Sequence, residues 1–290
     1  MRTEKEMLDT ILNFARNDEN IRVVLLNGSR ANPNVKKDIL QDFDIACIVN
    51  DVTPYVRNDD VPAHFGEILI LQEPENMQDP PAENNGHYAY LMQFMDGNRI
   101  DLSFYPLAQL DNVISDSLTV LLLDKDNLIK NLPPSSDSDY LPSIPTEKQF
   151  QDCCNEFWWV SPYVAKGLWR DELTYAKSML EGVLIHEQLL KMLTWYFGTK
   201  TGFKKAAGKQ GKYLKEELEP ELWTELEKTY SDANVENIWE ALFTSGRLFR
   251  RAAKAVAANF GFQYLQAEDD NVSEYLRCLK NLPKDAAPTA

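Results

Sequence analysis

The residues of this chain best suited to chemistry are two aspartates, Asp42 and Asp44, at the start of an apolar run. An earlier apolar run ends in Gly28 and Ser29. Successive side chains of a strand point to opposite faces, so Asp42 and Asp44 share one face. Two carboxylates held together repel unless a cation bridges them, and Mg²⁺ prefers a few carboxylates plus substrate phosphate oxygens. The pair therefore predicts a Mg²⁺ site; the alternative is a solvated pair at a strand edge.

A third carboxylate, Asp101, lies in the second arm of a predicted hairpin formed by residues 88–94 and 99–105. The dipeptide Asp96-Gly97 between two β-prone runs favours a tight primed turn. A charged side chain among apolar strand neighbours needs a partner or a metal, so Asp101 is expected to have one or the other.

These residues require a sheet to position them. Apolar spacing predicts a helix over residues 3–16, strands over 21–26, 44–49 and 67–71, the hairpin, and a further segment at 118–123. A Pro- and Ser-rich stretch, residues 132–145, is a linker by composition. We expect a mixed-sheet α/β domain at residues 1–135.

The pattern beyond the linker is helical and predicts an all-α helical bundle domain at residues 146–282. One wide apolar stripe, over residues 173–193, predicts a central helix that stops near Gly198. A second stripe, over residues 235–256, is ended by residues 259–261. His186, inside the first stripe, is expected to be a packed, hydrogen-bonded core residue. We expect the active site between the two domains.

Composition and charge limit the classes of substrate and the cellular location that we expect. The chain has 290 residues and a net charge of −15, which argues against a nucleic-acid substrate because such proteins usually carry a basic face. An acidic cleft would attract a polycationic small molecule, although acidity also keeps a protein soluble. No apolar run has the length of a membrane span, and the N-terminus lacks the apolar core of a signal peptide, so we expect a cytoplasmic protein. Histidines and cysteines lack zinc-ligand spacing.

The arrangement of Gly28-Ser29, Asp42-Phe43-Asp44-Ile45 and Asp101 resembles the DNA polymerase β-type nucleotidyltransferases. Residues 26–30, 152–170, 193–198 and 208–214 are similar to segments of the aminoglycoside 6-adenylyltransferase (streptomycin adenylyltransferase) family. This resemblance implies ATP and Mg²⁺, and transfer of AMP to a hydroxyl of streptomycin at the 6-position, which inactivates the antibiotic.

The chemistry of this reaction gives the residues roles. Asp42, Asp44 and Asp101 are the predicted metal ligands and catalytic residues, because two metal ions can stabilise both the attacking and the leaving oxygen. Gly28 and Ser29 are predicted to hold the β- and γ-phosphates, since a glycine turn lets backbone N–H groups approach them.

Other ATP contacts are expected from Arg30, whose alternative role is a surface salt bridge, and from Lys212, in a basic island of residues 204–215. Asp101 is the candidate general base, with Glu181 or Glu187 as alternatives.

Acids of the second domain, among them Glu156, could pair with the guanidinium groups of streptomycin. Three other functions remain open. The protein could transfer AMP to a different small cationic acceptor such as spectinomycin or a lincosamide, it could AMPylate proteins, or it could be a non-catalytic nucleotide-binding regulator. The sequence leaves the oligomeric state open but favours a monomer, and we expect no membrane and no nucleic-acid partner.

Overall fold

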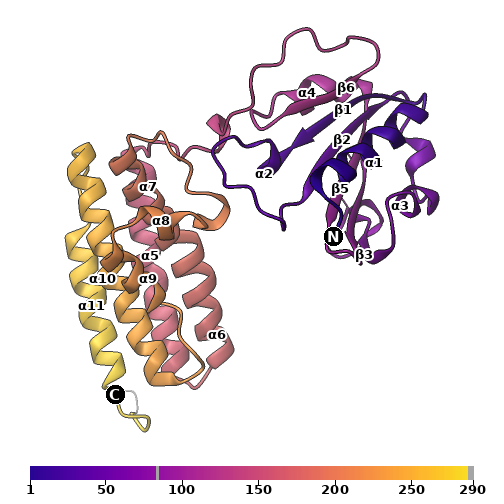
Figure 1. The fold of residues 1–290 in the computed structure, drawn as a ribbon. Helices are drawn as coiled ribbons and strands as arrows, with labels where there is room; N and C mark the ends of the chain where they lie inside the picture. The colour runs from indigo at the N-terminus through magenta and orange to yellow at the C-terminus, as the bar shows by residue number, and fades with distance from the viewer. Residues whose placement is uncertain (83–84, 287–290) are drawn as a thin grey trace. The chain divides into compact units, whose positions relative to one another are not determined.

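The computed structural model describes residues 1–82 and 85–286 (Figure 1). The chain divides into two compact units, Met1–Asp139 and Tyr140–Ala290, and the division falls within the Pro- and Ser-rich stretch. The first unit is built on a mixed sheet and the second is helical, which is the predicted fold class. No helix in the described part of the chain is long and apolar enough to cross a membrane.

The first unit contains a six-stranded sheet in the order β3-β4-β5-β2-β1-β6. The strands are β1 (Ile21–Asn27), β2 (Phe43–Val49), β3 (Ile68–Gln72), β4 (Tyr88–Phe94), β5 (Arg99–Pro106) and β6 (Val120–Asp124). Strands β2 and β5 are parallel, whereas the other neighbouring pairs are antiparallel. Its helices and turns are α1 (Glu4–Asn17), α2 (Gly28–Ala31), η1 (Thr53–Tyr55), α3 (Asp60–Ala63), η2 (Pro74–Asn76), η3 (Leu107–Gln109), α4 (Leu110–Ile114) and, at the division, η4 (Ser138–Tyr140).

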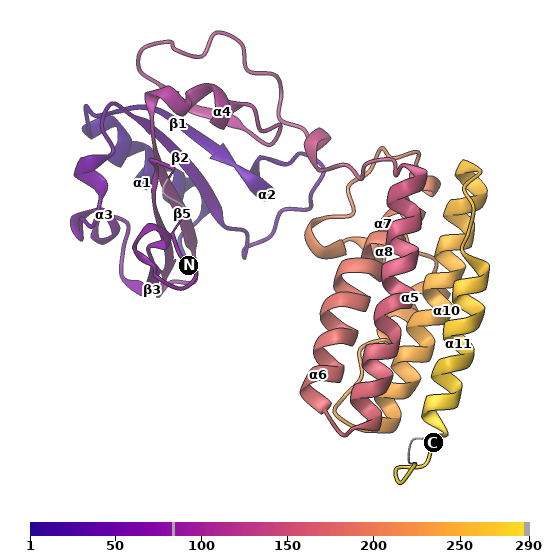
Figure 2. The ribbon, with the colours of Figure 1, turned by 180° about the vertical axis from the view of Figure 1, so that it is seen from behind.

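Helices α1 and α4 cover opposite faces of the sheet (Figure 2), and the alternating side chains of β2 pack into a separate core on each face. Phe43, Ile45 and Cys47 join a large apolar cluster with α1, whose first turn is held by a capping box between Thr3 and Glu6. The intervening Ala46 packs in a smaller cluster with α4. The even-numbered positions of this segment therefore face α4, and Asp42 and Asp44 belong to that set.

The β4–β5 hairpin is present, but the predicted primed turn is wrong. The N–H of Gly97 donates to the carbonyl of Phe94 at 3.0 Å, and Gly97 has a φ of 88°. A primed turn with two central residues at positive φ would require the same of Asp96, which is not among the positive-φ residues. The loop is therefore a turn of ordinary hand closed by one left-handed glycine.

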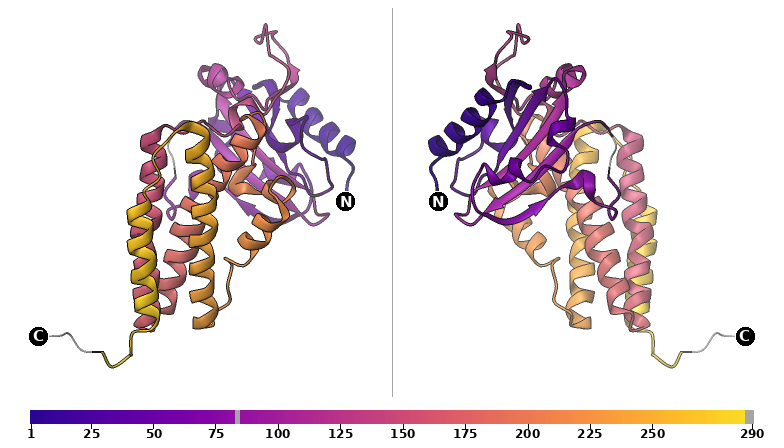
Figure 3. Two further views of the ribbon diagram at one scale, coloured as in Figure 1. Left: turned by 90° about the vertical axis from the view of Figure 1, so that its left-hand side faces the viewer. Right: turned by 90° about the vertical axis from the view of Figure 1, so that its right-hand side faces the viewer.

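The second unit is a bundle of long helices with shorter connecting elements (Figure 3). The elements are α5 (Glu147–Trp169), α6 (Leu173–Lys177), η5 (Ser178–Leu189), α7 (Leu190–Thr201), η6 (Lys209–Gly211), α8 (Leu214–Glu217), α9 (Pro220–Glu227), α10 (Val235–Phe260) and α11 (Gln266–Lys280). Helix α5 packs against α11 and η5, and α10 packs against α7. Segment η5 is a π-helix, an uncommon conformation that often lies at functional sites.

The central helix, predicted to stop near Gly198, continues to Thr201 as α7. The helix ends at Gly202, which has a φ of 63°. Gly198 serves packing instead, since a Cβ there would lie 2.4 Å from the Phe203 ring. The end of α10 is as predicted, with Gly261 in the left-handed conformation directly after Phe260.

A buried ion pair joins α10 to α11. Asp269 is fully buried and accepts hydrogen bonds from Arg250, Tyr264 and Ser273. Burial raises the pKa of the Asp269 carboxyl, but the hydrogen bonds from Arg250 and Tyr264 outweigh it, so the pKa lies below its ordinary value. Asp269 is thus a carboxylate whose acceptor sites are satisfied by the fold.

Candidate active site

The strand register brings two of the predicted aspartates together. Asp44 of β2 is the parallel partner of Asp101 in β5, and it is also the antiparallel partner of Asn27 in β1. The three residues form a row across three adjacent strands. We call Asp42, Asp44 and Asp101 the carboxylate cluster; Asp42 directly precedes β2.

An arginine lies within the carboxylate cluster. Arg99 donates from Nε and from one terminal nitrogen to the two oxygens of Asp101, at 2.7 and 2.9 Å. Its Nε is also 3.6 Å from an oxygen of Asp42. The guanidinium therefore supplies the positive charge that holds these carboxylates near one another in this structure.

Of the three aspartates, Asp44 has the ionised form most strongly disfavoured by its surroundings. Burial and the neighbouring charges of Asp101 and Asp42 raise the pKa of Asp44 to about 6. Burial also raises the pKa of Asp42, with Arg99 opposing the shift. A carboxylate with a raised pKa in a cavity is a candidate functional group.

Within residues 1–82 and 85–286, no set of three or more Asp, Glu, His or Cys side chains is preassembled to hold a metal ion. The donor chemistry of the carboxylate cluster nevertheless fits Mg²⁺. Asp44 carries a raised pKa because its neighbours repel its charge, and a divalent cation would relieve that repulsion. A cation at Asp101 would compete with Arg99, which already donates to both carboxylate oxygens. The metal role of these residues stays a prediction.

Gly28 lies directly against the cluster. It has a φ of 67°, and a Cβ at this position would lie 2.1 Å from a carboxylate oxygen of Asp44. A larger residue would therefore strain the backbone and displace the Asp44 carboxylate. Gly28 starts the single-turn helix α2, and the hydroxyl of Ser29 makes no hydrogen bond with the described residues. The predicted contacts of Gly28 and Ser29 with phosphates stay a prediction.

Arg30 is buried, and its guanidinium is held by contacts within the protein. Its guanidinium donates to the carbonyls of Asp42 and Gln41, at 3.1 and 2.7 Å, and stacks over the Phe43 ring at 3.8 Å. It also lies 3.5 Å from Glu4. These contacts favour a positioning role, in which Arg30 fixes the backbone that carries Asp42, over the predicted contact with ATP.

A cavity of about 360 Å³ opens on the α4 side of the sheet. Asp44 and Asp101 line it together with residues that sequence reasoning missed: Asn27, Ser103, Tyr105, Asn112 and Asp116. Asn27 precedes the Gly-Ser turn directly, and its side chain donates to Thr119 at 2.8 Å. The period-2 pattern from Asp101 onward could have identified Ser103 and Tyr105, since they share its face.

Of the candidate residues in the helical unit, one is held in an ion pair, whereas others are exposed. Glu181 forms an ion pair with Lys177, whereas Glu187 is exposed and lines a cavity of about 490 Å³ with His186. The expectation that His186 belongs to the core is wrong, because it is exposed. Lys212 is exposed beside the Tyr213 ring. Its predicted contact with ATP stays a prediction, as does the location of the active site between the domains.

A second cavity of the helical unit, of about 480 Å³, is lined by Asp152, Glu156 and Lys191. Glu156 is exposed and has no ion-pair partner among the described residues, whereas Asp152 pairs with Lys148. Lys191 lines both this cavity and the one beside Glu187.

Residues 1–279 match the family model described as streptomycin adenylyltransferase. The chain belongs to the streptomycin adenylyltransferase family. An aminoglycoside 6-adenylyltransferase of Campylobacter jejuni is 42% identical over 277 residues, which are 95% of each chain. Its counterpart in Bacillus subtilis (strain 168) is 39% identical over 95% of this chain and 97% of its own length. A crystal structure of an aminoglycoside 6-adenyltransferase from Bacillus subtilis shares 35% identity, covers 97% of this chain and 100% of its own, and has a TM-score of 0.48.

The match to the streptomycin adenylyltransferase family covers both units. It includes the Gly-Ser turn, the carboxylate cluster and the helical segments on which the sequence resemblance was based. The family assignment from sequence is therefore confirmed.

Proposed function

We propose that this chain is an adenylyltransferase that moves AMP from ATP to a hydroxyl of streptomycin, at the 6-position, and so inactivates the antibiotic. The observation that carries the proposal is the pairing of Asp44 with Asp101 beside Gly28, within a chain that belongs to this family along almost its whole length. The relatives named as aminoglycoside 6-adenylyltransferases support the acceptor class. ATP as the donor favours a cytoplasmic location.

Asp42, Asp44 and Asp101 would hold Mg²⁺, which when bound would stabilise charge on the phosphate oxygens. Gly28 and Ser29 would offer backbone N–H groups and a hydroxyl to the β- and γ-phosphates. Arg30 would keep the Asp42 backbone in place through its two carbonyl contacts.

In the reaction, the acceptor hydroxyl oxygen bonds to the α-phosphorus while the bond from that phosphorus to the leaving oxygen of pyrophosphate breaks. The hydroxyl proton passes to a carboxylate. Asp101 is our candidate for this base, once Arg99 has released it. Arg99 is then available to pair with the phosphates, whose charge matches a guanidinium.

Glu187 is the stronger of the two alternative bases in the helical unit. Glu181 is held by Lys177, whereas Glu187 faces a cavity without an ion-pair partner among the described residues. Replacing Asp101 and Glu187 separately by the amide distinguishes the two, because loss of the base alone removes the pH dependence of turnover on its acidic side.

Acceptor recognition would use exposed acids of the helical unit, because streptomycin carries guanidinium groups that bind carboxylates. Glu156 is the candidate, since it is exposed in a cavity and free of ion pairs with the described residues. Glu156→Gln is expected to raise KM for streptomycin while leaving KM for ATP unchanged.

The proposal is tested by incubating the protein with ATP, Mg²⁺ and streptomycin, and then measuring the mass of the drug. We expect a gain of one AMP unit on streptomycin, and NMR of the product should locate it at the 6-position. Spectinomycin and a lincosamide serve as comparison acceptors. An adduct on one of these alone would contradict the streptomycin assignment, and nucleotide binding without any adduct would favour a non-catalytic regulator.

A further inference from the structure

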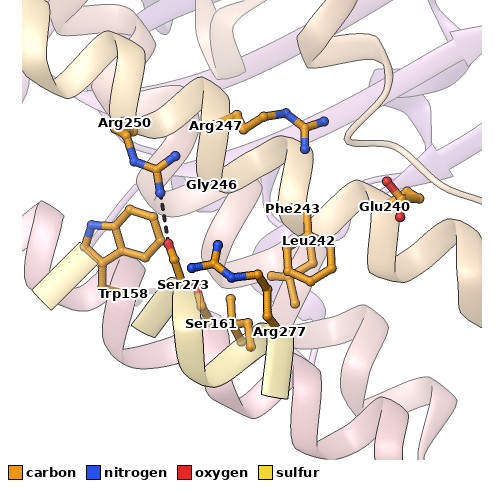
Figure 4. Close-up of a pocket in the computed structure, with 11 residues that line it drawn as sticks. Trp158, Ser161, Glu240, Leu242, Phe243, Gly246, Arg247, Arg250, Ser273 and Arg277 are labelled. Atoms are coloured by element: carbon orange, nitrogen blue, oxygen red, sulfur yellow. Dashed lines mark hydrogen bonds between the residues drawn. The ribbon is translucent and has the colours of Figure 1, made fainter. Parts of the chain in front are cut away.

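A separate cavity of about 330 Å³ lies within the helical unit, between α5, α10 and α11 (Figure 4). Its apolar walls are Trp158, Leu242, Phe243 and Leu276. Its lining residues are different from those of the cavity beside the carboxylate cluster. Its volume lies in the lower range of small-molecule sites.

The polar lining of this cavity is basic, although the whole chain carries a net charge of −15. Arg247, Arg250 and Arg277 line it with one acid, Glu240. Glu240 is itself paired with Lys280, at 3.0 Å. The cavity therefore repels cations such as aminoglycosides and favours an anion.

The three arginines differ in what they already bind. Arg250 is neutralised by the buried Asp269, and Arg277 pairs with Glu274 at the surface. Arg247 donates only to the hydroxyl of Thr244, at 2.7 Å, and has no acidic partner among the described residues. Arg247 is thus the guanidinium that can take a carboxylate from outside.

The hydroxyl groups of the cavity add no free donor. Ser161 donates to the carbonyl of Phe157 at 2.8 Å, and Ser273 donates to Asp269 at 3.0 Å while accepting from Arg250 (Figure 4). A phosphate dianion needs several donors, whereas a carboxylate is satisfied by one guanidinium through two parallel hydrogen bonds. The donors present match a carboxylate.

A glycine inside α10 keeps the cavity open. Gly246 has no positive φ, and a Cβ there would meet only the Trp158 ring, at 3.5 and 3.7 Å, which is ordinary contact. Neither conformation nor crowding therefore requires glycine, although glycine is a poor residue for a helix interior. The absence of a side chain at Gly246 leaves the edge of the buried Trp158 ring as part of the cavity wall.

We propose that this cavity binds a small organic carboxylate with an apolar body. The carboxylate pairs with Arg247, and the apolar body lies over Gly246 against Trp158 and Phe243. The site is distinct from the carboxylate cluster and uses only residues of the helical unit.

The test is calorimetric titration of the full chain with 3-phenylpropanoate and with its neutral amide, 3-phenylpropanamide. We expect one carboxylate bound per chain and an affinity for the amide weaker by about tenfold or more, because hydrogen bonds to charged groups are the stronger ones. Arg247→Ala should weaken carboxylate binding by a similar factor. Arg251→Ala, on the same helix and outside the cavity, should leave it unchanged.

Gly246→Leu fills the cavity and should abolish binding of both compounds, with its melting curve reporting whether it folds. Should it fail to fold, the pair Arg247→Ala and Arg251→Ala decides. Equal affinity for acid and amide, equal loss in the two arginine variants, or no binding to the wild-type chain would overturn the proposal.

Discussion

Two carboxylates of this molecule, Asp44 in the sheet unit and Asp269 in the helical unit, are both removed from solvent to a large degree and yet respond to their surroundings in opposite ways. Asp269 accepts hydrogen bonds from Arg250, Tyr264 and Ser273, and its pKa is lowered. Asp44 faces two further carboxylates, and its pKa is raised to about 6. Burial alone therefore does not distinguish a structural acid from a functional one; the balance of donors and like charges does.

The largest effect is expected at Asp44. Asp44→Asn should lower turnover in adenylyl transfer by about 10³-fold or more, since even one preorganised electrostatic contact is worth about 10²–10³-fold. The melting temperature should be maintained or raised, because the substitution removes a charge that its neighbours repel. Steady-state kinetics and thermal unfolding measure the two effects. Asp111→Asn, an exposed position on α4, is the control and should retain full turnover.

Substitution of Asp269 should have the opposite effect, a loss of stability without a loss of turnover. Asp269→Asn leaves Arg250 without its buried partner, and breaking such a pair costs about 3–5 kcal/mol of unfolding free energy. Chemical denaturation measures the loss, while turnover per folded molecule should be unchanged. The neighbouring Asp270→Asn keeps a side-chain oxygen that can accept from Gln266 and leaves the Asp269–Arg250 pair in place, so it should cost far less. Equal destabilisation by both variants would contradict the structural role of Asp269.

Substitutions at two glycines, Gly28 and Gly202, distinguish the effect of backbone strain from the effect of contact with the carboxylate cluster. Gly28 and Gly202 have similar φ values, 67° and 63°, but only Gly28 meets another group, the Asp44 carboxylate. Gly28→Ala should reduce turnover by about 10²-fold, the scale expected for an ångström of misplacement. Gly202→Ala should cost about 1–2 kcal/mol of stability with no loss of turnover. Similar kinetics for the two variants would show that Asp44 was not displaced.

The smallest expected effect is a pH dependence of stability. Because the folded pKa of Asp269 lies below its unfolded value, its ionised form stabilises the protein above about pH 4, and that contribution is lost as the pH falls through the folded pKa. The stability difference between wild type and Asp269→Asn should therefore shrink on acidification. Urea unfolding from pH 7 to pH 3.5 measures it, and a difference that grows at low pH would have the wrong sign.

Sequence patterns gave the sheet elements and the fold class because apolar periodicity is a local property. The pairing of Asp44 with Asp101 was within reach for the same reason, since both lie in strongly apolar strands. The turn at Asp96 was missed because the dipeptide suits more than one turn type. The contact between Gly198 and the ring of Phe203 could not be predicted from the sequence, because the two become neighbours only after folding.

The same limit applies to the side chains around the site. Arg99 and Arg30 owe their roles to partners that strand pairing and loop closure bring to them. The exposure of His186 depends on how the bundle packs, which an apolar stripe does not specify. Residue types and spacing thus predicted which side chains have suitable chemistry. The contacts that leave each side chain paired or unpaired depend on the tertiary structure.

The most direct test of the central claim is to locate a metal at the carboxylate cluster. Crystals grown with Mn²⁺ and a non-hydrolysable ATP analogue can be measured for anomalous scattering. We expect a peak about 2 Å from oxygens of Asp42, Asp44 and Asp101, with Arg99 released from Asp101. A bound nucleotide with no metal at these oxygens, and with the Arg99–Asp101 pair intact, would contradict this expectation.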